Sequence, residues 1–231
     1  MTTIKAVLFD MDGVLIEAKD WHYEALNQSL ALFGYEINRH EHLTSYDGLP
    51  TKTKLQKLTL EQGLPETLHS FINEMKQHYT ISMIQRYCRP RFNHEYALSR
   101  LKAEGYKLAV GSNSIRMTVE LMMEYAKLSH YFDFMLTNQD VKKSKPDPEM
   151  YLTAMARLGL QPEECIIVED NEHGIRAALA SGGHLLAVKE VSDVTYDAIK
   201  SKITEIETAD NTTPAHSLNF PSGNEPQRLA G

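Results

Sequence analysis

From about residue 90 onward, short apolar segments alternate with helical patterns, and this alternation constrains the fold more than any other feature. Apolar runs at 107–110, 134–137, 166–168 and 185–188 have the length of buried strands, and helical faces lie between them. Strands that are separated by helices are expected to be parallel, because a parallel connection needs a crossover. This part of the chain therefore predicts an α/β fold with a parallel sheet.

One more apolar strand is predicted at residues 4–9, far from the others in the chain. Residues 16–88 follow it with apolar side chains at helical spacing and no clear second strand. We therefore expect a Rossmann-like, doubly wound parallel sheet core formed by residues 1–15 and 89–206, with an inserted α-helical cap domain at 16–88. Residues 207–231 are rich in Asn, Thr, Pro, Ser and Gly, and this composition predicts a tail that can be flexible.

Composition and charge narrow the classes of partner. With 42% hydrophobic residues in 231, the chain can bury a sizeable core. Its formal net charge of −7 disfavours nucleic acid and anionic membranes as partners. The first apolar run is interrupted by Asp10 and Asp12 too early for a signal peptide, and no stretch approaches the roughly 20 apolar residues of a membrane span. Cys88 and Cys165 show no disulfide or zinc spacing, so we expect a cytoplasmic protein, while the oligomeric state stays open.

Polar residues follow the predicted strands at several places. These are Asp10-Met11-Asp12-Gly13, Ser112-Asn113-Ser114, Lys145, and Glu169-Asp170-Asn171. The carboxyl ends of parallel strands meet at one edge of the sheet, where ligands bind. The four segments are therefore expected to form one site.

The acidic residues point to phosphoryl chemistry. A carboxylate at the end of a buried strand, such as Asp10, is held rigidly and can attack phosphorus, while Asp12 can exchange a proton with the leaving oxygen. Four converging carboxylates, those of Asp10, Asp12, Glu169 and Asp170, need a counter-charge, and oxygen ligands favour Mg²⁺ over zinc. The alternatives are ordinary ones: solvated turn residues for the first pair, and a surface acidic pair or a helix N-cap for the second.

Lys145, Ser112 and Asn113 are the candidate phosphate binders. Pro146 and Pro148 follow Lys145 and stiffen this segment, so that the Lys145 side chain could be aimed inward. Phosphoryl transfer to a carboxylate needs cations on both reacting groups, which Mg²⁺ and one lysine would supply. Ser112 and Asn113 would add neutral donors, although Ser112 alone also fits the N-cap of a helix that begins near Ile115.

In this order the segments resemble the haloacid dehalogenase superfamily of aspartate-nucleophile phosphotransferases, in the branch with a helical cap between the first two motifs. The resemblance spans residues 4 to about 200 and rests on the segments 9–15, 112–113, 145–148 and 168–170 with 174–175.

The resemblance implies a role for each matching residue. Asp10 corresponds to the nucleophile and a metal ligand, and Asp12 to the general acid/base that also offers its carbonyl to the metal. Asp170 corresponds to a further metal ligand, and Glu169 to a residue that supports the metal shell. Ser112 and Lys145 correspond to phosphate binders.

The dehalogenases that name this superfamily lack an acid at the position of Asp12, so dehalogenation is not expected. The remaining activities are those of the phosphatases and of the similar β-phosphoglucomutases. His22 falls where those mutases carry a cap histidine, although a histidine on an amphipathic helix is an equally good interpretation. Ala18 stands where the mutases usually have Thr or Ser, and Thr51 where they have an arginine that clamps the distal phosphate. Lys52 is adjacent but lacks the bidentate fork of arginine, which favours hydrolysis.

We therefore predict a Mg²⁺-dependent phosphatase that hydrolyses a small phosphorylated metabolite, such as a sugar phosphate, through a phospho-aspartyl intermediate. The first alternative is a β-phosphoglucomutase-like phosphohexomutase. A second is a signalling receiver domain, although such modules place the phospho-acceptor on a middle strand and lack a helical insertion. The substrate is left open, because the candidate cap residues can line many pockets: Trp21, His22, Lys52, Lys76 and Tyr79.

Overall fold

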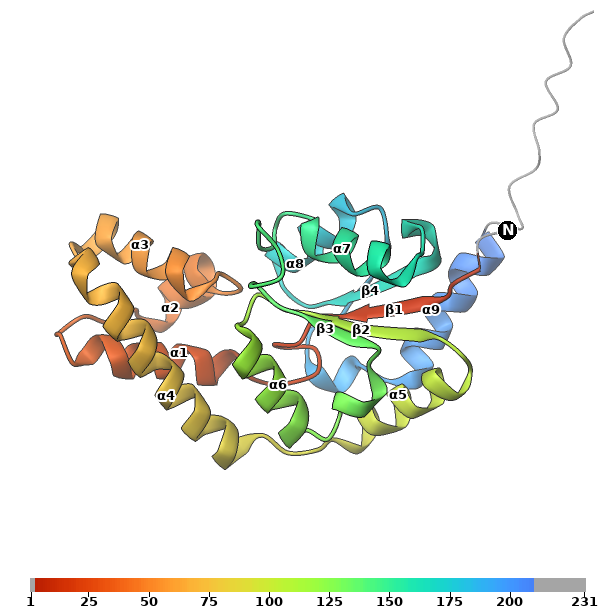
Figure 1. The fold of residues 1–231 in the computed structure, drawn as a ribbon, viewed down its shortest axis with the longest axis horizontal. Helices are drawn as coiled ribbons and strands as arrows, with labels where there is room; N and C mark the ends of the chain where they lie inside the picture. Colours follow the sequence, from red (N-terminus) through yellow and green to blue (C-terminus); the bar gives the residue numbers. More distant parts are fainter. Residues whose placement is uncertain (1–2, 210–231) are drawn as a thin grey trace, which may run out of the picture.

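The computed structural model describes residues 3–209 of the chain. At its centre is a five-stranded, fully parallel sheet in the order β3-β2-β1-β4-β5 (Figure 1). All five predicted strands are confirmed, with ends that differ by one or two residues. They are β1 (Ala6–Phe9), β2 (Lys107–Gly111), β3 (Phe134–Leu136), β4 (Cys165–Glu169) and β5 (His184–Ala187).

Helices cover both faces of the sheet, as expected for a doubly wound fold. Successive side chains of a strand point to opposite faces, and β1 illustrates this: Val7 and Phe9 pack into one buried cluster, Ala6 and Leu8 into another. The first cluster includes side chains of α5 (Phe92–Ala103), α6 (Arg116–Tyr125) and α9 (Tyr196–Ala209). The second includes those of α7 (Glu149–Leu158) and α8 (Glu172–Ala180). Because both faces are covered, β1 is apolar throughout.

The segment between β1 and β2, which we call the helical insertion, lies beyond the carboxyl ends of the strands (Figure 1). Residues 19–87 contain no strand and have an apolar cluster of their own around Leu26, Leu58 and Ile72. This confirms the predicted helical character, whereas a separate cap domain remains a prediction. The insertion consists of α1 (Lys19–Ala31), α2 (Arg39–Glu41), a π-helical turn (His42–Tyr46), α3 (Thr51–Gln62), a 3₁₀ turn (Glu66–Leu68) and α4 (His69–Tyr87).

The carboxyl end of the described chain differs from the prediction. Helix α9 continues to Ala209, past residue 207, where the tail was expected to begin, and the side chain of Glu207 accepts a hydrogen bond from the Ile4 amide at 3.1 Å. The rest of the predicted tail, 210–231, lies outside the described residues. Within residues 3–209 no helix is long and apolar enough to cross a membrane. Cys88 and Cys165 are both buried and free.

Candidate active site

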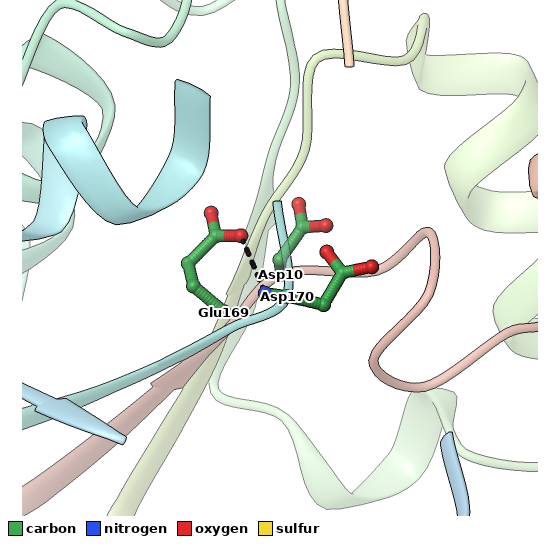
Figure 2. Close-up of side chains that lie close together, drawn as sticks. All are labelled: Asp10, Glu169 and Asp170. Carbon is green, nitrogen blue, oxygen red and sulfur yellow. Dashed lines mark hydrogen bonds between the residues drawn. The ribbon is translucent and has the colours of Figure 1, made fainter. Parts of the chain in front are cut away.

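The ends of β1 and β4, which are neighbours in the sheet, bring three carboxylates together. Asp10 follows β1, and its amide donates to the carbonyl of Val168 in β4 at 3.0 Å. Glu169 ends β4, and Asp170 comes next. Figure 2 shows the three carboxylates gathered at this edge, and one ligand atom of each lies within 4.8 Å of the others.

Lys145, from the loop that precedes α7, lies between two of these carboxylates. Its Nζ donates to Asp10 Oδ1 at 2.7 Å and to Glu169 Oε1 at 2.6 Å, and the Tyr151 hydroxyl donates to the same Glu169 oxygen at 2.5 Å. Burial and the charge of Glu169 raise the pKa of Asp10 well above its ordinary value, although Lys145 opposes the rise. Burial lowers the pKa of Lys145, but its two carboxylate partners outweigh this and raise it, so the ammonium stays charged.

The carboxylate of Asp12 is held by a different set of partners. Its Oδ2 accepts from the Ser114 hydroxyl at 3.0 Å, and its Oδ1 lies 3.1 Å from His22 Nε2. The other ring nitrogen of His22 lies 3.3 Å from the Lys76 ammonium. Since an ammonium can only donate, Nδ1 accepts and Nε2 carries the proton that points to Asp12. The insertion therefore orients Asp12 through His22.

These contacts are reflected in the pKa values of the pair. Burial alone would raise the pKa of Asp12, but the positive charge that His22 carries in the acidic range where Asp12 titrates, the His22 hydrogen bond and the Ser114 hydrogen bond outweigh it and lower the pKa. Burial and the charge of Lys76 lower the pKa of His22, in agreement with a neutral ring. Asp12 is therefore ionised and His22 neutral near pH 7.

Lys19 is a further cation at the site and comes from the first turn of α1. Its Nζ lies 2.5 Å from Asp170 Oδ2, and the Asp170 side chain is fully buried. Burial raises the pKa of Asp170 although Lys19 opposes the rise. Gly13 makes this approach possible, because it has a φ of +91° and a Cβ there would lie 2.0 Å from Asp170 Oδ2.

The donor set fits a hard divalent cation. Asp10, Glu169 and Asp170 offer carboxylate oxygens alone, which suit Mg²⁺ better than zinc. Burial is the main cause of the raised pKa values of Asp10 and Asp170, the neighbouring carboxylates add to it, and Lys145 and Lys19 oppose it. Of the four residues predicted as metal ligands, the structure thus brings three carboxylates together. The fourth, that of Asp12, faces Ser114 and His22 instead.

A cavity of about 360 Å³ lies between this edge of the sheet and the helical insertion. It is near the lower end of the range of ligand pockets, about 300–1,000 Å³, so a small metabolite fits it better than a polymer. The core contributes acidic and basic groups to its wall, and the insertion contributes basic groups together with the acidic Asp47. These residues are Asp10, Asp12 and Lys145 from the core, and His22, Lys54 and Lys76 from the insertion.

Comparison with known proteins identifies the family. The model of the haloacid dehalogenase-like hydrolases matches residues 7–188, which is most of the chain. The chain belongs to this family. The membership confirms the resemblance seen in the motifs and decides against the receiver-domain alternative.

Individual relatives in this hydrolase family are similar over nearly their whole length. A phosphoglycolate phosphatase of Aquifex aeolicus is 28% identical over 200 residues, which cover 83% of this chain and 92% of that protein. A phosphorylated carbohydrates phosphatase of Thermotoga maritima is 29% identical over 184 residues (78% and 82%). The pyrophosphatase PpaX of Bacillus velezensis is 31% identical over 192 residues (78% and 80%).

A solved structure shares the fold. The crystal structure of β-phosphoglucomutase from Clostridium difficile has a TM-score of 0.77 and 23% sequence identity, covering 89% of this chain and 100% of that one. The similarity confirms the α/β architecture predicted from the sequence.

The two polar residues after β2 have structural contacts in this hydrolase. The N-cap alternative for Ser112 is wrong: α6 begins at Arg116, and the Ser112 hydroxyl accepts from the Ser114 amide at 3.0 Å. The Asn113 side chain donates to the carbonyls of Gly48 and Lys145 and accepts from the Lys145 amide. Asn113 therefore fixes the Lys145 loop and joins it to the insertion, and phosphate binding by either residue stays a prediction.

The predicted cap residues separate into two groups. His22 and Lys76 line the cavity and contact each other, whereas Lys52 reaches the cavity as an exposed side chain. Trp21 stacks on Tyr87 and lines a different hollow, so it does not belong to this site.

Among the lining residues that sequence reasoning did not single out are Lys19, Asp47 and Lys54, whereas Ser114 was named in its segment without a role for its hydroxyl. A signal existed for Lys54, because Leu58 follows it by one helical step and both side chains are buried. Lys19 gave no comparable sign.

Proposed function

We propose that the protein is a Mg²⁺-dependent phosphatase that hydrolyses a small phosphorylated metabolite, such as a sugar phosphate, through a phospho-aspartyl intermediate. The observation that carries the proposal is the Asp10 carboxylate. It is fixed at the end of the central strand, bound by Lys145 at 2.7 Å, and faces the same cavity as Asp12. Relatives named as phosphatases of phosphoglycolate and of phosphorylated carbohydrates support the same reaction class.

In the first half of the reaction, an oxygen of Asp10 attacks phosphorus and the bond from phosphorus to the leaving oxygen breaks. The Asp12 carboxyl group gives its proton to that oxygen, which leaves as an alcohol. Asp12 is ionised in the free protein, but a substrate phosphate beside it raises its pKa, because like charges at short range disfavour ionisation. Asp12 can therefore enter the first step protonated.

In the second half, Asp12 is a carboxylate and takes a proton from water. The hydroxide attacks phosphorus, the bond to Asp10 breaks, and inorganic phosphate leaves with Asp10 regenerated. His22 and Ser114 hold the two oxygens of Asp12 throughout, which keeps the base aimed at the reacting water. The insertion covers the cavity and limits access of bulk water.

A divalent cation held by the carboxylate cluster would supply positive charge at the nucleophile. Asp10, Asp170 and the carbonyl of Asp12 would hold Mg²⁺, with Glu169 supporting the ligand shell. Bound there, Mg²⁺ would neutralise charge that develops on the transferring phosphoryl group. Lys145 holds the Asp10 carboxylate in place from the other side.

The test is a panel of phosphorylated sugars and small acids, with inorganic pyrophosphate included, assayed with Mg²⁺ for released phosphate. Asp10→Asn should abolish turnover of every substrate that the wild type hydrolyses. The matched control is Asp197→Asn, an exposed aspartate at the start of α9, which should retain activity. Mg²⁺-dependent phosphate release by folded Asp10→Asn protein would overturn the proposal.

A phosphohexomutase is the second candidate. It is favoured by His22, which links Asp12 to Lys76. In a mutase, His22 would hold Asp12 in position while Asp12 exchanges protons with two sugar hydroxyls in turn. This reading predicts that a hexose 1-phosphate becomes the 6-phosphate faster than phosphate appears, and that a bisphosphate primer accelerates the reaction. If free phosphate is the sole product, the phosphohexomutase candidate is rejected. Hydrolysis is preferred because Thr51, and Lys52 beside it, lack the bidentate guanidinium with which an arginine clamps a distal phosphate.

A further inference from the structure

Lys145 reaches Asp10 and Glu169 from the loop between β3 and α7, so its aim depends on what holds this loop. One side chain, that of Asn113, holds both backbone groups of Lys145. Asn113 Oδ1 accepts from the Lys145 amide at 3.0 Å, and Nδ2 donates to the Lys145 carbonyl at 3.2 Å. Lys145 is buried, and buried backbone groups need such partners. The position of the Lys145 backbone therefore depends on the amide of Asn113.

The same side chain also contacts the helical insertion. Asn113 Nδ2 donates to the carbonyl of Gly48 at 3.1 Å. Gly48 lies in the loop 47–50, between the π-helical turn and α3, and within residues 3–209 this is the one hydrogen bond that joins that loop to the core. A primary amide has two N–H groups, and both are used by these two carbonyls. The side chain therefore has no further hydrogen to offer to a phosphate oxygen.

Gly48 fits closely against the core at this point. Its φ is +70°, and a Cβ there would lie 2.9 Å from Asn171 Oδ1 and 3.3 Å from His173 Cδ2. Both the backbone conformation and the lack of space thus require glycine. Asn171 in turn donates to Asp170 Oδ1 at 3.1 Å. Gly48 therefore rests between the side chain that holds Lys145 and one that contacts Asp170.

We propose that Asn113 is a positioning residue, through which closure of the insertion fixes Lys145 in its place beside Asp10. The inference rests on the proposed function, in which Lys145 holds the nucleophile. While the loop 47–50 lies on the sheet edge, the Gly48 carbonyl fixes the rotation of the Asn113 amide, and the amide fixes the Lys145 backbone. When the loop withdraws, the amide is free to rotate. The nucleophile is thus fully aligned only when the insertion is closed and limits the access of bulk water.

The other polar contacts between insertion and core do not reach Lys145. In the described part of the chain, three further pairs of side chains join the two parts by a hydrogen bond or an ion pair. These pairs are His22–Asp12, Lys19–Asp170 and Gln77–Thr118. None of them includes Lys145 or Asn113, so the Asn113 amide is the direct connection from the insertion to Lys145.

The first test follows the Lys145 amide hydrogen of the free protein by NMR-detected hydrogen exchange. In Gly48→Ala the added Cβ has no room, so the loop should move and the Lys145 amide should exchange about 3- to 10-fold faster, the size expected for one hydrogen bond. Gly63→Ala is the matched control. Gly63 has nearly the same φ, +72°, but no described atom beyond its immediate neighbours lies within 4 Å of its Cβ position, so Lys145 should be unaffected. Amides of β4 should keep their protection in both variants, which separates a local release from a general loss of stability.

The second test measures phosphate release from the best substrate of the panel. Asn113→Ala should lower kcat/KM by about 10- to 100-fold, because a displaced Lys145 no longer aligns Asp10. Gly48→Ala should lower it by about 3- to 10-fold. The double variant should be no less active than Asn113→Ala, since without the amide the loop has no connection to Lys145. Asn93→Ala, at an exposed position of α5, is the control and should retain full activity.

The outcomes separate the two proposals. An unchanged exchange rate of the Lys145 amide in Gly48→Ala, an equal effect of Gly63→Ala, or additive losses in the double variant would overturn the role of Asn113 and leave the phosphatase intact. If Asn113→Ala does not fold, the comparison of Gly48→Ala with Gly63→Ala decides by itself. Absence of turnover by the wild type on the whole panel would contradict the phosphatase. The exchange rates would then still decide whether the loop of the insertion acts on Lys145.

Discussion

His22 Nε2 lies 3.1 Å from Asp12 Oδ1, and this contact joins the helical insertion to the loop that follows the central strand. The opposite nitrogen of the ring, Nδ1, lies 3.3 Å from the ammonium of Lys76. The orientation of the proposed acid/base therefore depends on the packing of α1 and α4 in the insertion. The imidazole of His22 thus links the carboxylate of Asp12 at the sheet edge to Lys76 in the insertion.

The first prediction concerns this imidazole. In His22→Gln the carboxylate of Asp12 loses a fixed partner, so we expect kcat to fall by about 10- to 100-fold, within the range of acid/base contributions. KM should change much less, because His22 positions the proton carrier and does not hold the phosphoryl group. Steady-state kinetics on the best substrate checks this, with His40→Gln, an exposed histidine in α2, as the control. A rise in KM at constant kcat would contradict the positioning role.

The sequence predicted the parts of the site that depend on two things: where each apolar strand ends, and the rule that parallel strands end at the same edge of the sheet. Asp10 and Glu169 stand where apolar strands end, and parallel strands end at one edge, so their meeting followed from the chain alone. The Lys145 loop was placed there by its motif, and the structure shows the contact that results.

The parts that could not be predicted depend on how the insertion packs onto the sheet. Lys76 and His22 are 54 positions apart in the chain. Lys19 belongs to the insertion, whereas its partner Asp170 follows β4 in the core. No local sequence pattern predicts either contact. Lys54 was overlooked because lysines on a helix are usually solvated, although its helical phase with Leu58 places it inside.

A second prediction concerns Lys19, whose ammonium lies 2.5 Å from Asp170 Oδ2. Mg²⁺ bound by Asp170 has to compete with this cation, so Lys19→Met should bind Mg²⁺ more tightly. A partly exposed ion pair is worth up to about 1 kcal/mol, which corresponds to a dissociation constant lower by up to about fivefold. Isothermal titration with Mg²⁺ measures the effect. Lys5→Met, which removes the remote Lys5–Glu164 pair, is the control and should leave the affinity unchanged.

Weaker Mg²⁺ binding in Lys19→Met would contradict competition. It would show that Lys19 supports the geometry of Asp170 and does not occupy the place of the metal.

A third prediction concerns stability and its pH dependence. The pKa of Lys54 is lowered from 10.5 to about 8, so its burial as a cation costs about 3 kcal/mol. The folded pKa lies below the unfolded one, so this cost is complete below pH 8 and disappears as the pH rises towards 10.5. Lys54→Met should therefore be more stable than the wild type at pH 7, and the difference should narrow by pH 10. Urea denaturation at the two pH values measures it.

Lys52→Met is the matched control for this measurement, because Lys52 is exposed on the same helix and its removal should change stability by less than about 0.5 kcal/mol. A Lys54→Met protein less stable than the wild type at pH 7 would mean that the ammonium has a stabilising partner.

The last prediction tests whether the insertion is a folding unit of its own, as a separate cap domain requires. Leu58 is fully buried in the cluster within the insertion, whereas Leu60, two residues further along α3, is 87% exposed. Leu58→Ala should cost about 2–5 kcal/mol. Hydrogen exchange should then accelerate in α1, α3 and α4, while β1, β2 and β4 keep their protection, because their side chains belong to other clusters. Leu60→Ala should leave both regions unchanged. Equal acceleration in the sheet would show that core and insertion unfold together.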